Sequence, residues 1–66
     1  MNASKIGKRL TELRGNRSQA EVSKAVKIQP STLSMYESGS RIPRDEIKER
    51  LAKYYGVDVQ ALFFGD

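Results

Sequence analysis

The sequence predicts an all-α fold, a compact bundle of five helices that forms a single domain over residues 1–66. Apolar residues recur at helical spacing in five segments, and no segment shows the alternation of apolar and polar residues that indicates a strand. Capping residues, Gly and Pro separate the five segments by short connections, as a helical bundle requires. A chain of this length buries only about 60% of its unfolded surface, so it has room for one domain.

The first helix is predicted to run to about residue 14. Asn2 or Ser4 can cap its N-terminus, because both have short polar side chains that accept a hydrogen bond from the first turn. Its apolar residues lie at i, i+4 and i+7, which places them on one face. These residues, expected to face the core, are Ile6, Leu10 and Leu13.

Two short helices joined by a tight turn are predicted over about residues 18–39. Ser18 and Glu21 have the spacing of a capping box, so a helix should run from residue 19 to about residue 26. Pro30 suits the first position of the next helix, and Gly39 suits the left-handed residue after its end. The residues expected to face the core are Val22, Ala25 and Val26 in one helix, and Leu33 and Tyr36 in the other.

Two further helices are predicted after a loop at residues 40–43, from which Ile42 is expected to enter the core. Asp45 and Glu46 stand in the first turn of the fourth helix, where their charge complements the helix dipole. Gly56 ends this helix, and Asp58 can cap the last one. The expected core residues are Ile47, Leu51, Tyr54 and Tyr55 in the fourth helix and Val59, Leu62 and one of Phe63 and Phe64 in the last.

Phe63 and Phe64 are adjacent, so one face of a helix cannot bury both rings. The surplus ring is a candidate contact in a homodimer, because an exposed large apolar side chain favours association.

The composition excludes several kinds of function. The chain has no Cys and no His, which removes disulfides, thiolate metal sites and the commonest metal ligand and general base. We therefore expect no metal, no cofactor and no enzymatic activity. The longest apolar run is four residues, far short of a membrane span, and the N-terminus lacks the apolar core of a signal peptide. These features predict a cytoplasmic protein without a membrane partner.

Charge is divided unevenly along the chain. The net charge is +4, but residues 1–44 hold nine Lys and Arg against three Asp and Glu, whereas residues 45–66 hold three against five. The basic part contains the pair of short helices, as expected of a protein that binds a polyanion. Ordinary solvation of a small surface would fit the same count, so charge alone leaves both interpretations open.

The pair of short helices has the pattern of a helix-turn-helix, which places its second helix in the major groove of DNA. Helices of eight or nine residues cannot fold alone, so the rest of the chain must support them. The outward side of the second helix carries no charge and consists of Ser31, Ser34 and Met35.

These pieces, taken in order, resemble the lambda-repressor-like helix-turn-helix domain, the family of phage repressors, Cro proteins and XRE-type regulators. The resemblance covers residues 6–64 and rests on IGKRLTELR, SQAEVSKAV, STLSMYESG, RIP and LAKYYGVDVQALF. It implies a sequence-specific regulator of transcription, a repressor that binds double-stranded DNA as a homodimer on a roughly palindromic operator.

The resemblance also implies roles for single residues. Gln19 matches a glutamine that contacts a DNA phosphate and braces the recognition helix, and Arg14 and Glu37 match a partly buried ion pair. Lys27 replaces the usual glycine of the turn and must accept a left-handed or otherwise strained conformation, at a cost of roughly 1 kcal/mol. The implied base contacts are Gln29, Pro30, Ser31, Ser34 and Met35. The phosphate contacts are Gln19, Arg17, Ser38, Gly39, Ser40 and Arg41, those of the loop in part through main-chain N–H groups.

Two alternatives stay open. The same fold serves as the antitoxin of toxin–antitoxin pairs and as the controller of restriction systems, and either could bring an unidentified regulatory protein as a partner. A small helical adaptor that binds a protein through Ser31, Ser34 and Met35 would have no DNA role. Only DNA binding requires a band of basic side chains beside the third helix, made by Arg41 and several of Lys5, Lys8, Arg9, Arg17, Lys24 and Lys27.

Overall fold

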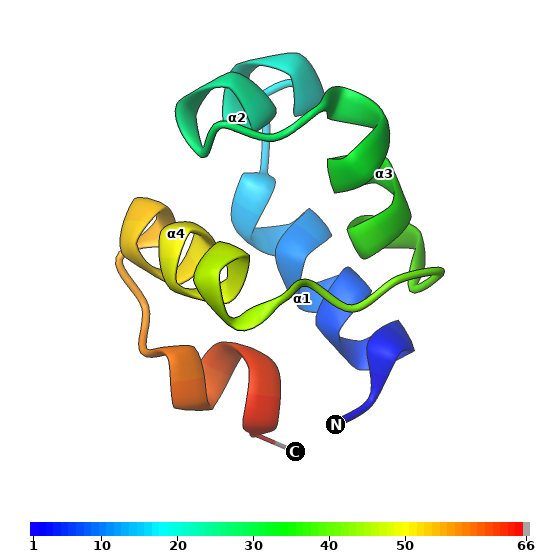
Figure 1. Cartoon of the computed structure of the whole chain (residues 1–66), viewed down its shortest axis with the longest axis vertical. Coiled ribbons are helices and arrows are strands. Elements are labelled where there is room, and N and C mark those ends of the chain that lie inside the picture. Colours follow the sequence, from blue (N-terminus) through cyan, green and yellow to red (C-terminus); the bar gives the residue numbers. More distant parts are fainter. Residues whose placement is uncertain (66) are drawn as a thin grey trace.

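The computed structural model describes residues 1–65, and this part of the chain contains five helical segments and no strand. The predicted all-α fold of five helices is therefore confirmed. Figure 1 shows α2 and α3 at one end of the molecule, α1 through its middle, and α4 and the last segment on the other side. The segments are α1 (Ala3–Arg14), α2 (Gln19–Ala25), α3 (Pro30–Ser38), α4 (Asp45–Tyr55) and η1 (Gln60–Phe64).

The predicted caps begin the first two helices. The side chain of Asn2 accepts a hydrogen bond from the backbone N–H of Lys5, and Ser18 Oγ accepts one from the N–H of Glu21, each at 3.0 Å. Both bonds satisfy N–H groups that have no partner inside the helix. Of the predicted alternatives for α1, the structure therefore selects Asn2.

Left-handed residues end the later helices and form the turn between α2 and α3. Gly39 follows α3 with φ 80°, and Gly56 follows α4 with φ 68°. Lys27 has φ 61°, so of the two predicted possibilities the structure shows the left-handed conformation, although this residue is not a glycine. The N–H of Ile28 donates to the carbonyl of Ser23 at 2.9 Å, which closes the turn before Pro30 starts α3.

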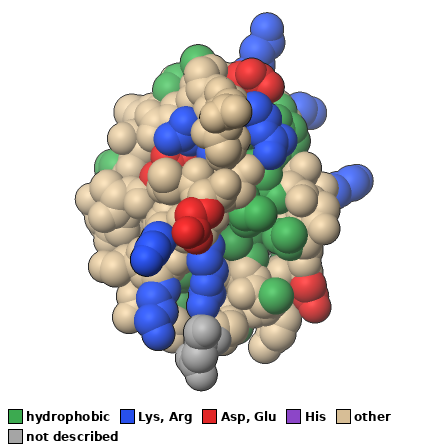
Figure 2. Space-filling model, turned by 180° about the vertical axis from the view of Figure 1, so that it is seen from behind, with side chains coloured by type: hydrophobic (Ala, Val, Ile, Leu, Met, Phe, Trp, Pro, Cys, Tyr) green, Lys and Arg blue, Asp and Glu red, His purple; other side chains and the backbone are tan. Residues whose placement is uncertain are grey.

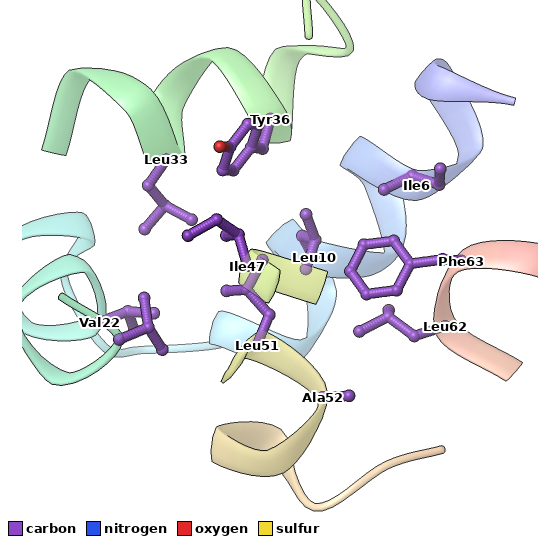
Figure 3. Close-up of a cluster of buried hydrophobic side chains, with 11 residues drawn as sticks. Ile6, Leu10, Val22, Leu33, Tyr36, Ile47, Leu51, Ala52, Leu62 and Phe63 are labelled. Atoms are coloured by element: carbon purple, nitrogen blue, oxygen red, sulfur yellow. The ribbon is translucent and has the colours of Figure 1, made fainter. Parts of the chain in front are cut away.

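One hydrophobic core joins all five segments. Leu33 and Tyr36 point from α3 into this core, as predicted, and meet side chains from α1, α2, α4 and η1 (Figure 3). Its buried members are Ile6, Leu10, Val22, Val26, Leu33, Tyr36, Ile47, Leu51, Ala52, Leu62 and Phe63. The core therefore fixes the face of α3 that turns away from the protein.

Two predicted core residues are exposed. Ala25 lies on the surface of α2 and Ser23 is buried instead, because its hydroxyl donates to the carbonyl of Ala20 at 3.1 Å and so satisfies a polar group inside the protein. Ile42 is 40% exposed and Pro43 is buried in its place. The segment there is extended, and successive side chains of an extended chain point to opposite sides, so only one of the two can face the core.

The backbones of α1 and α3 approach closely at Gly7, a contact that the sequence analysis missed. Gly7 is buried, and a Cβ added there would overlap the carbonyl oxygen of Glu37 and lie 2.8 Å from that of Tyr36. Only glycine leaves room for this approach. A glycine inside an otherwise regular helical pattern is the signal that could have indicated it.

No helix in the described residues is long and apolar enough to cross a membrane.

Candidate nucleic-acid interface

The outward face of α3 is uncharged and stands opposite the face that enters the core. Ser31, Ser34 and Ser38 are exposed, and Met35 is half-buried. Gln29 and Pro30 are exposed where the helix begins. These side chains offer hydroxyls, one amide and one thioether, the groups that hydrogen-bond or contact base edges without the cost of desolvating a charge.

A network of three side chains from three helices holds α3 in place. The carboxylate of Glu37 in α3 accepts hydrogen bonds from Arg14 of α1, from Nε at 2.8 Å and from Nη2 at 3.1 Å. Gln19, the first residue of α2, donates Nε2 to the same carboxylate at 2.8 Å. The side chain of Glu37 is only 6% exposed, so this ion pair is partly buried and bidentate.

The charge of Arg14 is stabilised by this contact. The hydrogen bond to Glu37 raises the pKa of Arg14 above its ordinary value, while burial acts in the opposite direction. Arg14 also donates Nη1 to the carbonyl of Arg17 at 2.8 Å and so ties the loop after α1 to the same network. The Glu37 side of α3, the start of α2 and the end of α1 therefore form one braced unit.

Arg17, which is predicted to contact a phosphate, also binds the end of α1. Its Nη2 donates to the carbonyl of Leu13 at 2.9 Å and its Nε to that of Arg14 at 3.2 Å. Its guanidinium carbon lies 5.3 Å from the ring centres of Tyr54 and Tyr55. Arg17 caps the C-terminal carbonyls of α1 because those carbonyls have no partner within the helix. Its contact with a phosphate stays a prediction.

The loop after α3 corrects the expected phosphate contact of Gly39. The N–H of Gly39 donates to the carbonyl of Tyr36 at 3.2 Å, and that of Ser40 to Met35 at 3.0 Å. Both N–H groups complete the end of α3 and are not free for a phosphate. Gly39 has no side chain, so with its N–H in use it cannot make the predicted phosphate contact. The hydroxyls of Ser38 and Ser40 lie 2.8 Å apart on the exposed side of the loop.

A basic groove of about 280 Å³ lies beside the start of α3. It is bounded by the turn after α2, by α3 and by the loop that leads into α4, with Gln29 and Thr32 in its wall. Its cationic members are Lys27, Arg41, Arg44 and Arg50. No role was predicted for Arg44 from the sequence, although its position three residues after Arg41 in the same loop was the available signal.

Three of these four cations are free to attract an anion. Arg50 pairs with Glu46 and donates Nη1 to the carbonyls of Val26 and Lys27 at 3.3 and 3.4 Å, so it secures the turn. Lys27, Arg41 and Arg44 are exposed and form no ion pair with any described residue. Their positive charge therefore faces solvent next to the uncharged face of α3.

Comparison with known protein families agrees with this geometry. A family model described as "Helix-turn-helix" matches residues 8–62, which include all of α2, α3 and α4. The chain belongs to the lambda-repressor-like helix-turn-helix family. This family is one of DNA-binding regulators of transcription, so the predicted class of function is supported. No match to the chain was found among curated proteins or among solved structures.

Two aromatic residues of this helix-turn-helix domain, Phe63 and Phe64, were predicted to contribute to a dimer contact. Phe63 is 1% exposed and belongs to the core, so it cannot touch a second copy of the chain. Phe64 is 46% exposed, as expected when one helical face cannot hold both rings. Lys48 lies over the Phe64 ring, with Nζ 4.9 Å from its centre. Packing of η1 against α1 decides which ring is buried.

The helix-turn-helix domain contains one unpaired buried hydroxyl among its described residues, that of Tyr55. Burial, followed by the negative charge of Glu37, raises the pKa of Tyr55 from 10.0 to about 12. Above pH 10 the unfolded chain loses this proton while the folded chain keeps it, so unfolding is favoured as the pH rises.

Tyr55→Phe should therefore remove part of the alkaline loss of stability. Urea unfolding of both proteins between pH 7 and 11 measures it. At pH 7 the variant should be as stable as the wild type or slightly more so, because a buried hydroxyl without a partner costs free energy. From pH 10 upward its advantage should grow. An unchanged pH dependence would mean that the hydroxyl is solvated in the folded state.

Proposed function

We propose that this protein is a sequence-specific repressor that acts as a homodimer on a roughly palindromic operator. The observation that supports the proposal is the position of the uncharged face of α3. On one side of it lies the start of α2, which Gln19 ties to Glu37. On the other side lie three cations that form no ion pair with a described residue, namely Lys27, Arg41 and Arg44. In this arrangement α3 enters the major groove, and the cations meet the phosphates that border it. Occupation of the operator then blocks transcription.

The proposed base contacts come from Gln29, Ser31, Ser34 and Met35. The amide of Gln29 can bind adenine through two hydrogen bonds, and the thioether of Met35 can pack on a thymine methyl. Pro30 enters the groove but has no N–H to donate. Because no charged side chain reads a base, each contact is weak, and DNA shape carries much of the discrimination.

The proposed phosphate contacts lie on both sides of α3. Gln19 uses one amide N–H for Glu37, which leaves the second for a phosphate at the start of α2. On the other side, Arg41 acts together with Lys27 and Arg44, and Ser38 and Ser40 add hydroxyls. An adaptor that bound only protein would not need these unpaired cations, so their position favours DNA. Antitoxins and restriction controllers of this fold also bind DNA, and the proposal leaves room for a regulatory protein.

The test compares operator and random DNA. The operator is first selected from a random DNA pool with the wild-type protein. Ser31→Ala and Met35→Ala should then each weaken operator binding by about 1 kcal/mol, or roughly fivefold, with little change on random DNA. Arg41→Ala should weaken both alike, because a phosphate contact does not depend on sequence. Equilibrium binding of the wild type and the three variants at one fixed salt concentration measures the eight affinities, since phosphate contacts are sensitive to salt.

Thermal melting serves as the control, because Ser31 and Arg41 are exposed and their removal should leave the fold intact. If Met35→Ala lowers the melting temperature by several degrees and leaves the ratio of operator to random affinity unaltered, Met35 supports the core and reads no base. If the wild-type protein selects no sequence at all, the proposed repressor function is wrong.

A further inference from the structure

A hollow of about 310 Å³ lies between the C-terminal ends of α2 and α4. Figure 1 shows these two helix ends on the opposite side of the molecule from α3. In Figure 2, which shows the molecule from behind, Lys and Arg side chains project from this region at the upper right. We call it the α2–α4 hollow, and its lining consists of Ala25, Val26, Lys27, Arg50, Lys53 and Tyr54.

All charged side chains of the α2–α4 hollow are positive. Arg50 pairs with Glu46 and binds carbonyls of the turn after α2. Lys27 and Lys53, in contrast, are exposed and form no ion pair with a described residue. Arg50 and Lys53 are three residues apart on one helix, where like charges destabilise each other. The hollow therefore attracts a negatively charged group.

DNA bound to α3 does not account for the charge of Lys53. Arg44, just before α4, borders the basic groove beside α3, and Lys53 lies in the last turn of the same helix. With a rise of 1.5 Å per residue, the two positions are about 13 Å apart along α4. Because the hollow is also on the opposite side of the molecule from α3, the partner of Lys53 is a different anion.

The α2–α4 hollow also offers apolar surface. Ala25 is exposed at the end of α2, and Tyr54 is half-buried on α4. An apolar side chain that packs on these two residues removes apolar surface from water. The volume is at the lower end of the roughly 300–1,000 Å³ of small-molecule pockets, and the hollow is open to solvent. A segment of a protein therefore fits it better than an enclosed small molecule.

The backbone of Lys27 supports a functional role for its charge. Its φ of 61° is left-handed, a conformation that glycine adopts without strain. Strained residues of this kind cluster at functional sites, where the strain is retained for the sake of the side chain or its position. Lys27 lines both the α2–α4 hollow and the basic groove beside α3. Glycine would relieve the strain but would remove the positive charge from both places.

We propose that the α2–α4 hollow is a docking site for an acidic peptide segment of another protein. One apolar side chain of the segment packs on Ala25 and Tyr54, and its carboxylates bind Lys27 and Lys53. The match of negative to positive charge selects this partner over neutral or basic segments. Docking at this hollow goes beyond the proposed repressor function and does not depend on it.

Peptides selected from a random displayed library against the immobilised full chain test the proposal. Fluorescence anisotropy of the synthetic peptides measures their affinity for the wild type and for four variants. Lys53→Glu reverses a charge of the hollow, and Ala25→Asp puts a carboxylate on its apolar surface. Lys24→Glu is the matched control, because Lys24 is exposed on α2 outside the hollow, and Arg41→Glu reports binding beside α3. Circular dichroism and thermal melting check that each variant is folded.

We expect selected peptides that combine Asp and Glu with an apolar residue. Their dissociation constants should rise by about tenfold or more with Lys53→Glu and with Ala25→Asp, and should change little with Lys24→Glu and Arg41→Glu.

Three results would overturn the docking site. Peptides that tolerate Lys53→Glu but lose affinity with Arg41→Glu bind beside α3 in place of DNA. Equal losses with every charge reversal would mean a general attraction to a basic protein. A selection that yields no acidic peptides would mean that the cations of the hollow recognise no such segment. Each of these results leaves the proposed repressor function to be judged from the operator measurements alone.

Discussion

Replacing Gly7 with alanine should destabilise the domain by about 3 kcal/mol, the upper end of the cost of overpacking a core. The added Cβ would meet the backbone of Glu37 and Tyr36, which has no rotamer to move away. The overlap can be relieved only if α1 and α3 move apart. This movement is costly because the contact between α1 and α3 supports the whole helix-turn-helix. A 66-residue domain has a free energy of unfolding of about 3–10 kcal/mol, so much of its stability would be lost.

The sign of the stability change in Gly7→Ala distinguishes overpacking from helix propensity. Alanine favours an isolated helix over glycine by about 1 kcal/mol, so local propensity alone would make the variant more stable. Urea unfolding of Gly7→Ala, with Lys8→Ala as a control at an exposed position of the same helix, separates the two contributions. A Gly7→Ala protein as stable as the control would mean that α1 and α3 do not approach as closely as the structure has them.

Replacing Arg14 with methionine should cost a similar amount, about 3 kcal/mol, the lower end of the range for breaking a buried ion pair. The methionine leaves the carboxylate of Glu37, 6% exposed, with the amide of Gln19 as its remaining partner in the network. The lower end applies because the side chain of Arg14 is itself 21% exposed, so water can partly replace it. DNA affinity should fall as well, because the network positions α2 and α3.

Two further variants isolate the origin of this cost. Arg14→Met/Glu37→Met should recover most of the lost stability, since removing both charges leaves no buried charge without a partner. Glu46→Gln removes one partner of the exposed pair with Arg50 and should cost less than about 1 kcal/mol. Chemical denaturation of the four proteins gives the comparison. If Arg14→Met costs no more than Glu46→Gln, the pair behaves as two solvated surface charges.

The sequence predicted the helices well because their limits depend on neighbouring residues. The capping bonds at Asn2 and Ser18 reach three residues along the chain, and Pro30 and Gly39 act at their own positions. The uncharged face of α3 could be predicted for the same reason. Once Leu33 and Tyr36 turn inward, helical spacing determines which side chains turn outward.

The candidate site was predicted only in part, because several of its details depend on contacts with distant segments. The N–H of Gly39 binds a carbonyl at the end of α3 and is therefore not free for a phosphate, and the side chain of Arg17 caps the end of α1. Arg44 joins the basic groove because its loop lies beside the turn after α2. No periodicity within one helix contains this information.

The sequence by itself thus determined the fold class, the approximate extent of the helices and the uncharged outward face of α3, all of which follow from short-range hydrogen bonds and helical spacing. Only the tertiary structure decided that Phe63 rather than Phe64 is buried, that Gly7 admits α3, and that Arg9 reaches a carbonyl 53 residues away. These outcomes depend on which surfaces meet when the five helices pack together, and each contact excludes its alternatives by volume and by the need to satisfy buried polar groups.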